Sequence, residues 1–321
     1  MKKPRIYITR KIPGETMTEL SSNFDIRMWN HEETPVPREV LLEEAKNANG
    51  IVCMLTDNID HKLLESAPNL QIIANMAVGY DNIDVEVAKE KGVIVTNTPN
   101  VLTETTADLT FALLMATARR IVEASNYIRD DNWKDWSPYL LAGSDIHGKT
   151  IGIVGMGRIG QAVAKRAKGF GMKILYHNRN RKPDAEKELQ ASYSNFENLI
   201  SKSDYVVSVV PLTSETKYLF NQKVFEQMKA SAIFINVSRG QVVDEEALYR
   251  ALLSKQIKGA GLDVFENEPI RSNHPFLALS NVVCLPHIGS ASLETRTEMI
   301  QLCMDNIEGF FRGTGAKTPV N

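Results

Sequence analysis

Three polar residues in the second half of the sequence have side chains suited to catalysis. They are Arg239, Glu268 and His287, and they lie in the stretches INVSRGQVVDEEAL, DVFENEP and NVVCLPHIGS, at or just after runs that predict β-strands. Ligands of open α/β sheets bind outside the carboxyl ends of the strands, so these positions are where chemistry is expected. An imidazole titrates near neutral pH and can transfer a proton, and a guanidinium binds a carboxylate with a planar fork of donors. Any one of the three, taken alone, could be an ordinary polar loop residue.

Short β-branched runs alternate with helical patterns, as in the helical stretch that begins at Pro37. This alternation indicates an α/β architecture with parallel sheets, because parallel strands need crossover connections. The expected strands are 5–9, 25–29, 50–54, 71–75 and 93–97, followed by 149–155, 172–178, 204–210, 232–238, 259–265 and 281–287. Between the two series, the pattern over 103–130 predicts one long helix, and the Trp-rich loop 132–148 predicts a hinge and linker. A last helix is expected from about residue 291 to 312.

Composition argues against several classes of protein. The chain has 321 residues, and since a single core stops growing at about 250–300 residues, two domains are expected. A formal charge of −2 argues against a protein that binds nucleic acid by neutralising phosphates. The longest apolar run, 111–118, is shorter than the roughly 20 residues of a membrane span, and the N-terminus lacks the apolar stretch of a signal peptide. We therefore expect a cytoplasmic protein. The three cysteines, Cys53, Cys284 and Cys303, predict neither a disulfide framework nor a zinc site, and no other metal site is expected.

A glycine-rich turn is the most informative stretch of the chain. Gly155, Gly157 and Gly160 form G-x-G-x-x-G between an apolar strand and an amphipathic helix, and a second strand follows. In this context the first glycine permits a tight turn, the second lets the backbone approach a pyrophosphate, and the third lets helix and strand pack closely. The free N–H groups of the helix start favour a phosphate. The turn predicts a dinucleotide site.

The stretch YHNRNRK, at 176–182, ends the second strand of this unit. An acidic residue there would bind the ribose 2′-OH of NAD, but the sequence has Asn178 followed by Arg179. A guanidinium can bind a 2′-phosphate, which a carboxylate would repel. We therefore predict a preference for NADP(H), with NAD(H) also possible. The alternative is a solvated basic loop beside an adenosine pocket that does not discriminate.

Together these stretches resemble the D-2-hydroxyacid dehydrogenase family over the whole chain, and within it most of all the glyoxylate/hydroxypyruvate reductases. VGYDNID at 78–84 is similar to the family's substrate loop, and NVSRG, ENEP and PHIGS to its arginine, glutamate and histidine motifs. The resemblance implies two Rossmann-like, doubly wound parallel-sheet domains with an active-site cleft between them. Residues 1–98 and 288–321 would form the substrate-binding domain and 99–287 the dinucleotide-binding domain. The segment of about 103–148, with Trp133 and Trp136, resembles a dimerisation arm and implies a homodimer, although its aromatic residues could pack within one chain.

The resemblance also implies roles for individual residues. His287 would be the general acid, Glu268 would orient its imidazole, and Arg239 would bind the substrate carboxylate and polarise the keto oxygen. The N–H groups of Val78 and Gly79 would bind the same carboxylate. Further cofactor contacts are implied at Arg158, Ile159, Thr106, Pro211, Val237 and Asp263.

The expected reaction is the NADPH-preferring reduction of small 2-keto acids, glyoxylate or hydroxypyruvate, to (R)- or D-2-hydroxy acids. Other D-2-hydroxyacid dehydrogenases, acting on pyruvate, larger keto acids or 3-phosphoglycerate, share the motifs and remain alternatives. Formate dehydrogenases of the superfamily carry glutamine where Glu268 stands, so the glutamate argues against that activity. A corepressor of the C-terminal-binding-protein type, which senses a dinucleotide, is an alternative of a different class.

Overall fold

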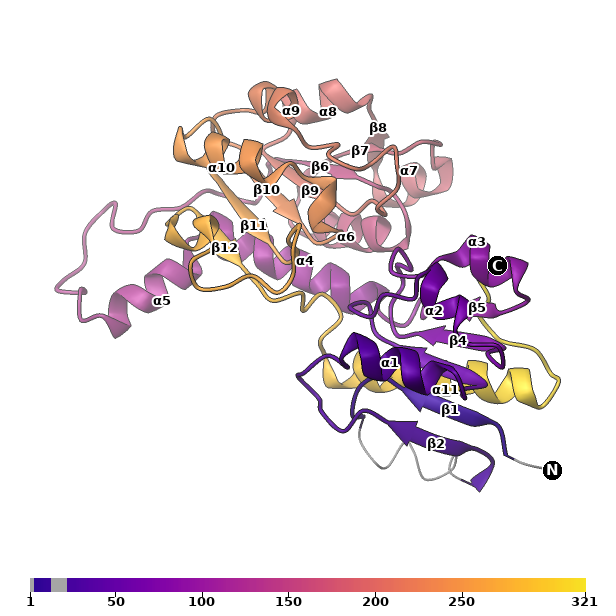
Figure 1. Cartoon of the computed structure of the whole chain (residues 1–321). Coiled ribbons are helices and arrows are strands. Elements are labelled where there is room, and N and C mark those ends of the chain that lie inside the picture. The colour runs from indigo at the N-terminus through magenta and orange to yellow at the C-terminus, as the bar shows by residue number, and fades with distance from the viewer. Residues whose placement is uncertain (1–2, 13–21) are drawn as a thin grey trace. The chain divides into compact units, whose positions relative to one another are not determined.

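The computed structural model describes residues 3–12 and 22–321, and the chain divides into two compact units (Figure 1). The first unit comprises Met1–Leu102 and Ser292–Asn321, and the second comprises Thr103–Ala291. The chain thus leaves the first unit, builds the second, and returns. The division falls after Leu102 and after Ala291, whereas the sequence motifs placed it after residues 98 and 287.

The first unit is a five-stranded parallel sheet with helices on both faces. Its strands are β1 (Arg5–Ile8), β2 (Asp25–Met28), β3 (Gly50–Cys53), β4 (Ile72–Asn75) and β5 (Ile94–Thr96), in the order β2-β1-β3-β4-β5. Its helices are α1 (Arg38–Ala45), α2 (His61–Glu65), α3 (Val85–Glu90) and α11 (Leu293–Phe311). Side chains alternate between the faces along each strand, so Ile51 and Ile73 pack with the first three helices while Gly50 faces Ile307 of α11. The returning chain also bonds to the sheet edge, where the Val320 N–H donates to the Val95 carbonyl.

The second unit is a seven-stranded parallel sheet. Its strands are β6 (Thr150–Val154), β7 (Lys173–His177), β8 (Ala191–Tyr193), β9 (Tyr205–Ser208), β10 (Ile233–Asn236), β11 (Gly259–Leu262) and β12 (Val282–Cys284). The spatial order is β12-β11-β10-β9-β6-β7-β8, so the chain moves outward in one direction from β6 and then in the other. This is the doubly wound order of a Rossmann domain, and ligands of such sheets bind at the carboxyl edge near the reversal.

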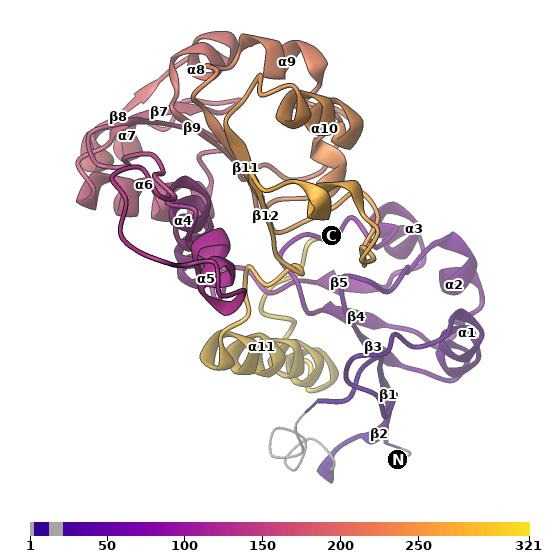
Figure 2. The same cartoon turned by 90° about the vertical axis from the view of Figure 1, so that its left-hand side faces the viewer.

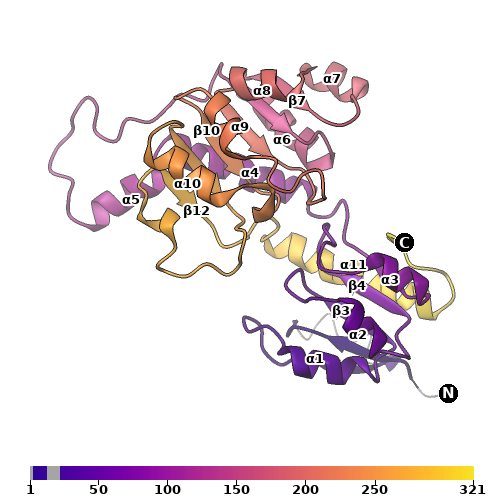
Figure 3. The ribbon, with the colours of Figure 1, turned by 45° about the horizontal axis from the view of Figure 1, so that its top comes forward.

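Helices cover both faces of the second sheet (Figure 2). One face packs against α4 (Thr103–Ala118) and α6 (Arg158–Gly169), and the other against α8 (Phe196–Lys202), α9 (Gln222–Gln227) and α10 (Glu245–Leu253). The short helix α7 (Pro183–Leu189) connects β7 to β8. The helix α5 (Ile121–Arg129) has no buried residue, and Figure 3 shows it pointing away from the sheet of its own unit.

One expectation about the elements is wrong, and one strand was missed. The pattern over 103–130 forms two helices, α4 and α5, because Arg120 adopts a left-handed backbone with φ of 54°. The returning loop explains the break, since the Ser144 N–H donates to the Ala118 carbonyl at 2.8 Å and so occupies an acceptor at the end of α4. The strand β8 was not predicted from the sequence; it is three residues long and pairs with β7 at the edge of the sheet. The other expected strands and the last helix are confirmed to within a few residues at their ends.

The longest apolar run of the sequence, 111–118, forms the second half of α4 and packs into the core of the second unit. Among the residues that the structure describes, no helix is long and apolar enough to cross a membrane.

Candidate active site and dinucleotide-binding edge

The three candidate catalytic residues follow three neighbouring strands of the second sheet. Arg239 follows β10, Glu268 lies in the loop after β11, and His287 follows β12. These strands are adjacent and parallel, with β11 paired to both β10 and β12, so their carboxyl ends lie at one edge. The sheet topology therefore brings together residues that are far apart in the sequence.

Glu268 and His287 form a directly bonded pair. The His287 Nδ1 lies 2.8 Å from one Glu268 carboxylate oxygen, and the other oxygen accepts the Phe265 N–H at 2.9 Å. The His287 backbone is held as well, because its N–H donates to the Asp263 carbonyl at 2.9 Å. A carboxylate at Nδ1 fixes the orientation of the imidazole and leaves Nε2 to exchange a proton with a substrate. The ring makes no other hydrogen bond within the described part of the chain.

The turn that carries Arg239 is fixed by a buried polar network. The side-chain oxygen of Asn236, at the end of β10, accepts bonds from the N–H and the hydroxyl of Ser238, and its amide donates to the Arg239 carbonyl at 3.0 Å. The Ser238 hydroxyl also shares a 3.1 Å hydrogen bond with that of Ser208 at the end of β9. One guanidinium nitrogen of Arg239 donates to the Ser238 carbonyl at 2.9 Å. Residues at the ends of two strands, β9 and β10, therefore hold the backbone that carries Arg239.

The glycine-rich turn joins β6 to α6. Gly155 has φ of 104°, which an L side chain rarely adopts, and Gly160 lies so close to the turn that a Cβ there would sit 2.0 Å from the Gly155 carbonyl oxygen. Gly157 is the N-cap of α6 and makes no side-chain cap, and Arg158 and Ile159 form the start of the helix. The helix thus begins with backbone N–H groups and no acidic side chain in its first turn. Such a helix start binds a phosphate.

Asn178 and Arg179 lie at the end of β7, beside this turn. The Asn178 side chain accepts the Met156 N–H at 3.1 Å and donates to the Asn180 carbonyl at 2.9 Å, so it braces the glycine-rich turn. Arg179 is exposed, and its side chain forms no hydrogen bond or ion pair with any described residue. Arg181, in contrast, makes two bonds to the Glu186 carboxylate and lies over the Tyr193 ring, and this ion pair lowers the pKa of Glu186. Of the arginines in this loop, Arg179 is the one available to a ligand.

The remaining candidate cofactor residues follow the same edge of the sheet. Pro211 comes after β9 and is exposed, while Val237 comes directly after β10 and packs on the core. Asp263, directly after β11, and Thr106, on α4, both lie beside Gly289 and are buried. The strand order therefore sets these positions in a row, from Asn178 at β7 to Asp263 at β11. A row of this kind suits an extended ligand such as a dinucleotide.

The candidate substrate loop lies in the first unit, directly after β4. The carbonyls of Val78 and Gly79 accept hydrogen bonds from the side-chain amides of Asn97 and Asn75, each at 2.8 Å. Neither the Val78 nor the Gly79 N–H donates a hydrogen bond to any described residue. With both carbonyls engaged, the turn offers two N–H donors, which is a suitable arrangement for an anion.

Comparison with known proteins gives a consistent result. Residues 111–289 match the model of the D-isomer specific 2-hydroxyacid dehydrogenase, NAD binding domain. The glyoxylate reductase of Korarchaeum cryptofilum is 51% identical over 97% of this chain and 94% of its own length. The TT0316 protein of Thermus thermophilus has a similar structure, with a TM-score of 0.92 and 44% identity over 99% of this chain and all of its own.

The chain belongs to the D-isomer specific 2-hydroxyacid dehydrogenase family. It is accordingly an NAD(P)-dependent oxidoreductase. Another similar structure is the NADPH-dependent glyoxylate/hydroxypyruvate reductase of Sinorhizobium meliloti in complex with NADP and malonate, with a TM-score of 0.85 and 35% identity over 99% of this chain and 97% of its own.

The described residues of this dehydrogenase fit a nicotinamide dinucleotide. One carboxylate oxygen of Asp263 is buried without a hydrogen-bond partner among them, while the other accepts the Ile288 N–H at 2.8 Å. Burial raises the pKa of Asp263 and the Ile288 N–H opposes the shift. A buried acceptor without a partner is costly unless a ligand completes it, and a carboxamide supplies a donor of that kind. The open glycine turn after β6, near the middle of the same edge, fits the pyrophosphate.

Several supporting residues of the dehydrogenase were missed at the level of the sequence. Asn236, Ser208 and Ser238 hold the arginine turn, and Asn75 and Asn97 hold the Val78–Gly79 turn. Asn75 and Asn236 each end a buried strand, and a polar residue at that point is the signal that would have singled them out. The cysteines are free thiols, with Cys53 and Cys303 buried and Cys284 partly exposed.

Proposed function

We propose that this dehydrogenase reduces glyoxylate and hydroxypyruvate to the corresponding D-2-hydroxy acids and prefers NADPH, with NADH also usable. The observation that carries the proposal is the bonded His287–Glu268 pair beside Arg239, at the same sheet edge as the glycine-rich turn. The names of the similar reductases support the choice of keto acids.

We assign two tasks to the side chains of this protein: the transfer of a proton to the substrate and the binding of the substrate carboxylate. When bound, the nicotinamide cofactor would supply a hydride to the 2-keto carbon. His287 gives the proton from Nε2 to the resulting alkoxide oxygen, and the Glu268 carboxylate stabilises the protonated imidazole. Arg239 binds the substrate carboxylate with its fork of donors and polarises the keto oxygen, so it stabilises the negative charge that develops there.

We assign the first unit the role of substrate-binding domain and the second that of dinucleotide-binding domain. The N–H groups of Val78 and Gly79 would donate to the substrate carboxylate, because both are free of other partners among the described residues. Asn75 and Asn97 keep the two carbonyls of this turn engaged and so keep its N–H groups available.

The preference for NADPH is assigned to Arg179. Its guanidinium is exposed and without a bonded partner in the described part of the chain, so it is free to bind a 2′-phosphate. Asn178 carries no negative charge that would repel the phosphate. Arg179 also acts on Glu215, whose pKa is lowered mainly by the hydrogen bond from Thr213 and further by this arginine.

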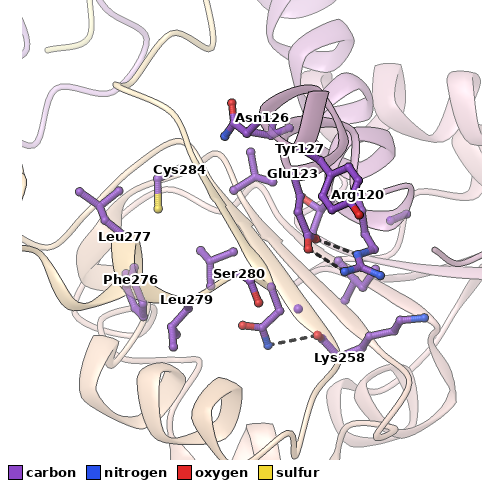
Figure 4. A pocket seen from close by; sticks show the side chains of 18 of the residues that line it. Arg120, Glu123, Asn126, Tyr127, Lys258, Phe276, Leu277, Leu279, Ser280 and Cys284 are labelled. Carbon is purple, nitrogen blue, oxygen red and sulfur yellow. Dashed lines mark hydrogen bonds and ion pairs between the residues drawn. The ribbon is translucent and has the colours of Figure 1, made fainter. Parts of the chain in front are cut away.

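We further propose that the enzyme is a homodimer that uses the arm formed by α5 and the loop 130–148. Trp136 is 77% and Tyr139 is 86% exposed, and α5 buries no side chain within its own chain. Beside the arm, a pocket of about 790 Å³ opens between α5 and the edge strand β12 (Figure 4). Exposed aromatic residues on an arm, and separately an exposed sheet edge, are both typical of a surface that a partner covers. Light scattering coupled to gel filtration tests this, since a monomer would contradict it.

The decisive experiment is a kinetic matrix of NADPH and NADH against glyoxylate, hydroxypyruvate, pyruvate and larger keto acids. We expect the highest kcat/KM with NADPH and one of the two small keto acids. A higher value for pyruvate or a larger acid would move the assignment to another D-2-hydroxyacid dehydrogenase. Binding of dinucleotide without turnover would favour the corepressor-like alternative. The cytoplasmic location also stays a prediction, which cell fractionation tests.

A further inference from the structure

Glu245 is a partly buried carboxylate that none of the assignments above uses. It is the first residue of α10, and its side chain is 19% exposed. One carboxylate oxygen accepts the Glu266 N–H at 2.7 Å, and the other lies 3.6 Å from Nε2 of His274. The capping of α10 does not need it, because the preceding Asp244 already accepts the Ala247 N–H.

The peptide that Glu245 binds is the point where two functional loops touch. A Cβ on Gly240, the residue after Arg239, would lie 1.8 Å from the Phe265 carbonyl carbon and 2.2 Å from the Glu266 nitrogen. The turn that carries Arg239 is therefore in direct contact with the Phe265–Glu266 peptide. The N–H of the same Phe265 donates to Glu268, which in turn binds His287.

Glu245 also faces the far end of the loop that carries Glu268. The His274 ring packs between Phe265 and Phe276, with centroid distances of 5.6 and 5.2 Å. Glu245 therefore contacts this loop twice, through the hydrogen bond from the Glu266 N–H and through its carboxylate beside the His274 imidazole. Burial raises the pKa of Glu245, and the Glu266 N–H and the His274 imidazole oppose that shift. The Glu266 carboxylate, the Tyr218 hydroxyl and the Cys284 thiol are further titratable groups that interact with it.

We infer that Glu245 is a positioning residue for catalysis: it fixes the Phe265–Glu266 peptide and thereby sets the orientation of Glu268 against His287. The inference rests on the proposed function of the His287–Glu268 pair. A purely structural role at the start of α10 is the competing explanation, since a carboxylate in the first turn of a helix stabilises it. Glu246→Ala distinguishes the two explanations, because Glu246 lies in the same turn, is exposed, and pairs among the described residues only with Arg250.

The test compares Glu245→Ala, Glu245→Gln and the matched control Glu246→Ala. We expect Glu245→Ala to lower kcat with glyoxylate and NADPH by about 10-fold or more, as misplaced catalytic groups do, and to leave the Kd for NADPH within about twofold. Glu245→Gln keeps an oxygen that accepts the Glu266 N–H, so it should retain kcat within about threefold. Glu246→Ala should match the wild type. Equal losses in Glu245→Ala and Glu246→Ala, or a wild-type kcat in Glu245→Ala, would overturn the inference.

A second readout needs no substrate. A histidine Nδ1–H that donates to a carboxylate gives a downfield proton NMR signal, which His287→Asn would identify by its loss. We expect this signal in the wild type, Glu245→Gln and Glu246→Ala, and its broadening or loss in Glu245→Ala. An unchanged signal in Glu245→Ala contradicts the inference, whether or not the wild type reduces a keto acid. A wild-type enzyme that reduces no keto acid would contradict only the proposed function. Should the alanine variant fail to fold, Glu245→Asp keeps the charge but shortens the reach, and the same loss of signal and of kcat is expected.

Discussion

The two ends of the carboxyl edge in the second unit differ in how their charged side chains are held. At the β10–β12 end, Glu268 is bonded to His287 and to the Phe265 N–H. The turn of Arg239 is held by Asn236 and, through Ser238, by Ser208 of the neighbouring strand. At the β7 end, Arg179 is exposed and without a bonded partner among the described residues. The side chains at the β10–β12 end are held in place before any ligand binds. At the β7 end, the Arg179 guanidinium is exposed on a loop.

The difference follows from the tasks assigned to the two ends. Proton transfer depends on the distance and direction between two atoms, so its groups must be held in place in advance. Recognition of a phosphate depends mainly on charge and on available donors, so a long guanidinium side chain can adjust to it. Substitutions at the braced end should therefore affect kcat, and substitutions at the exposed end should affect the KM for the cofactor.

Removal of the imidazole is expected to have the largest effect. His287→Ala should lower kcat for keto-acid reduction by about 10²-fold or more, because general acid catalysis contributes on that scale. The affinity for NADPH, measured by the quenching of protein fluorescence, should change little. Near-normal turnover in this variant would assign the acid to another group and remove the functional contrast between the two ends.

Exchange of the arginine for another cation is expected to have the next largest effect. Arg239→Lys should lower kcat/KM for the keto acid by about 10- to 100-fold, because a point ammonium cannot reproduce two parallel bonds to a carboxylate. Steady-state kinetics at saturating NADPH measures this. A loss of less than about threefold would assign carboxylate recognition mainly to the Val78–Gly79 turn.

At the exposed end, Arg179→Ala should raise the KM for NADPH by about 10-fold and leave the KM for NADH nearly unchanged, since only the former cofactor has a 2′-phosphate. Arg181→Ala is the matched control, because the Arg181 guanidinium is already paired with Glu186. Equal effects of Arg179→Ala on the two cofactors would contradict the assignment of the phosphate site.

The smallest effect is expected for Asn178→Asp. A carboxylate there can still accept the Met156 N–H, so the glycine-rich turn should stay in place, but it would repel a 2′-phosphate and accept a bond from a ribose 2′-OH. We expect the ratio of kcat/KM for NADPH to that for NADH to fall by about fivefold. A loss of affinity for both cofactors would show that the neutral amide serves mainly to brace the turn.

Much of the site could be predicted because its residues stand in short, ordered motifs. Gly155 and Gly157 stand between β6 and α6, Gly160 lies in the first turn of α6, and Arg239, Glu268 and His287 follow three strand ends. The supports that lie far from those residues along the chain could not be predicted. Glu245 and Glu266 are separated along the chain, and no local pattern indicates that one binds the other.

The sequence by itself determined most of the strands and helices, because β-branched apolar runs, glycine turns and capping residues act over a few neighbouring positions. It also determined which chemical groups follow the strand ends. Only the tertiary structure decided which of these groups meet, because contact depends on which strands become neighbours in the sheet. For the same reason the loop at Gly143–Ser144 ended α4 at Ala118, and the side chain of Asn178 became a brace for the glycine-rich turn.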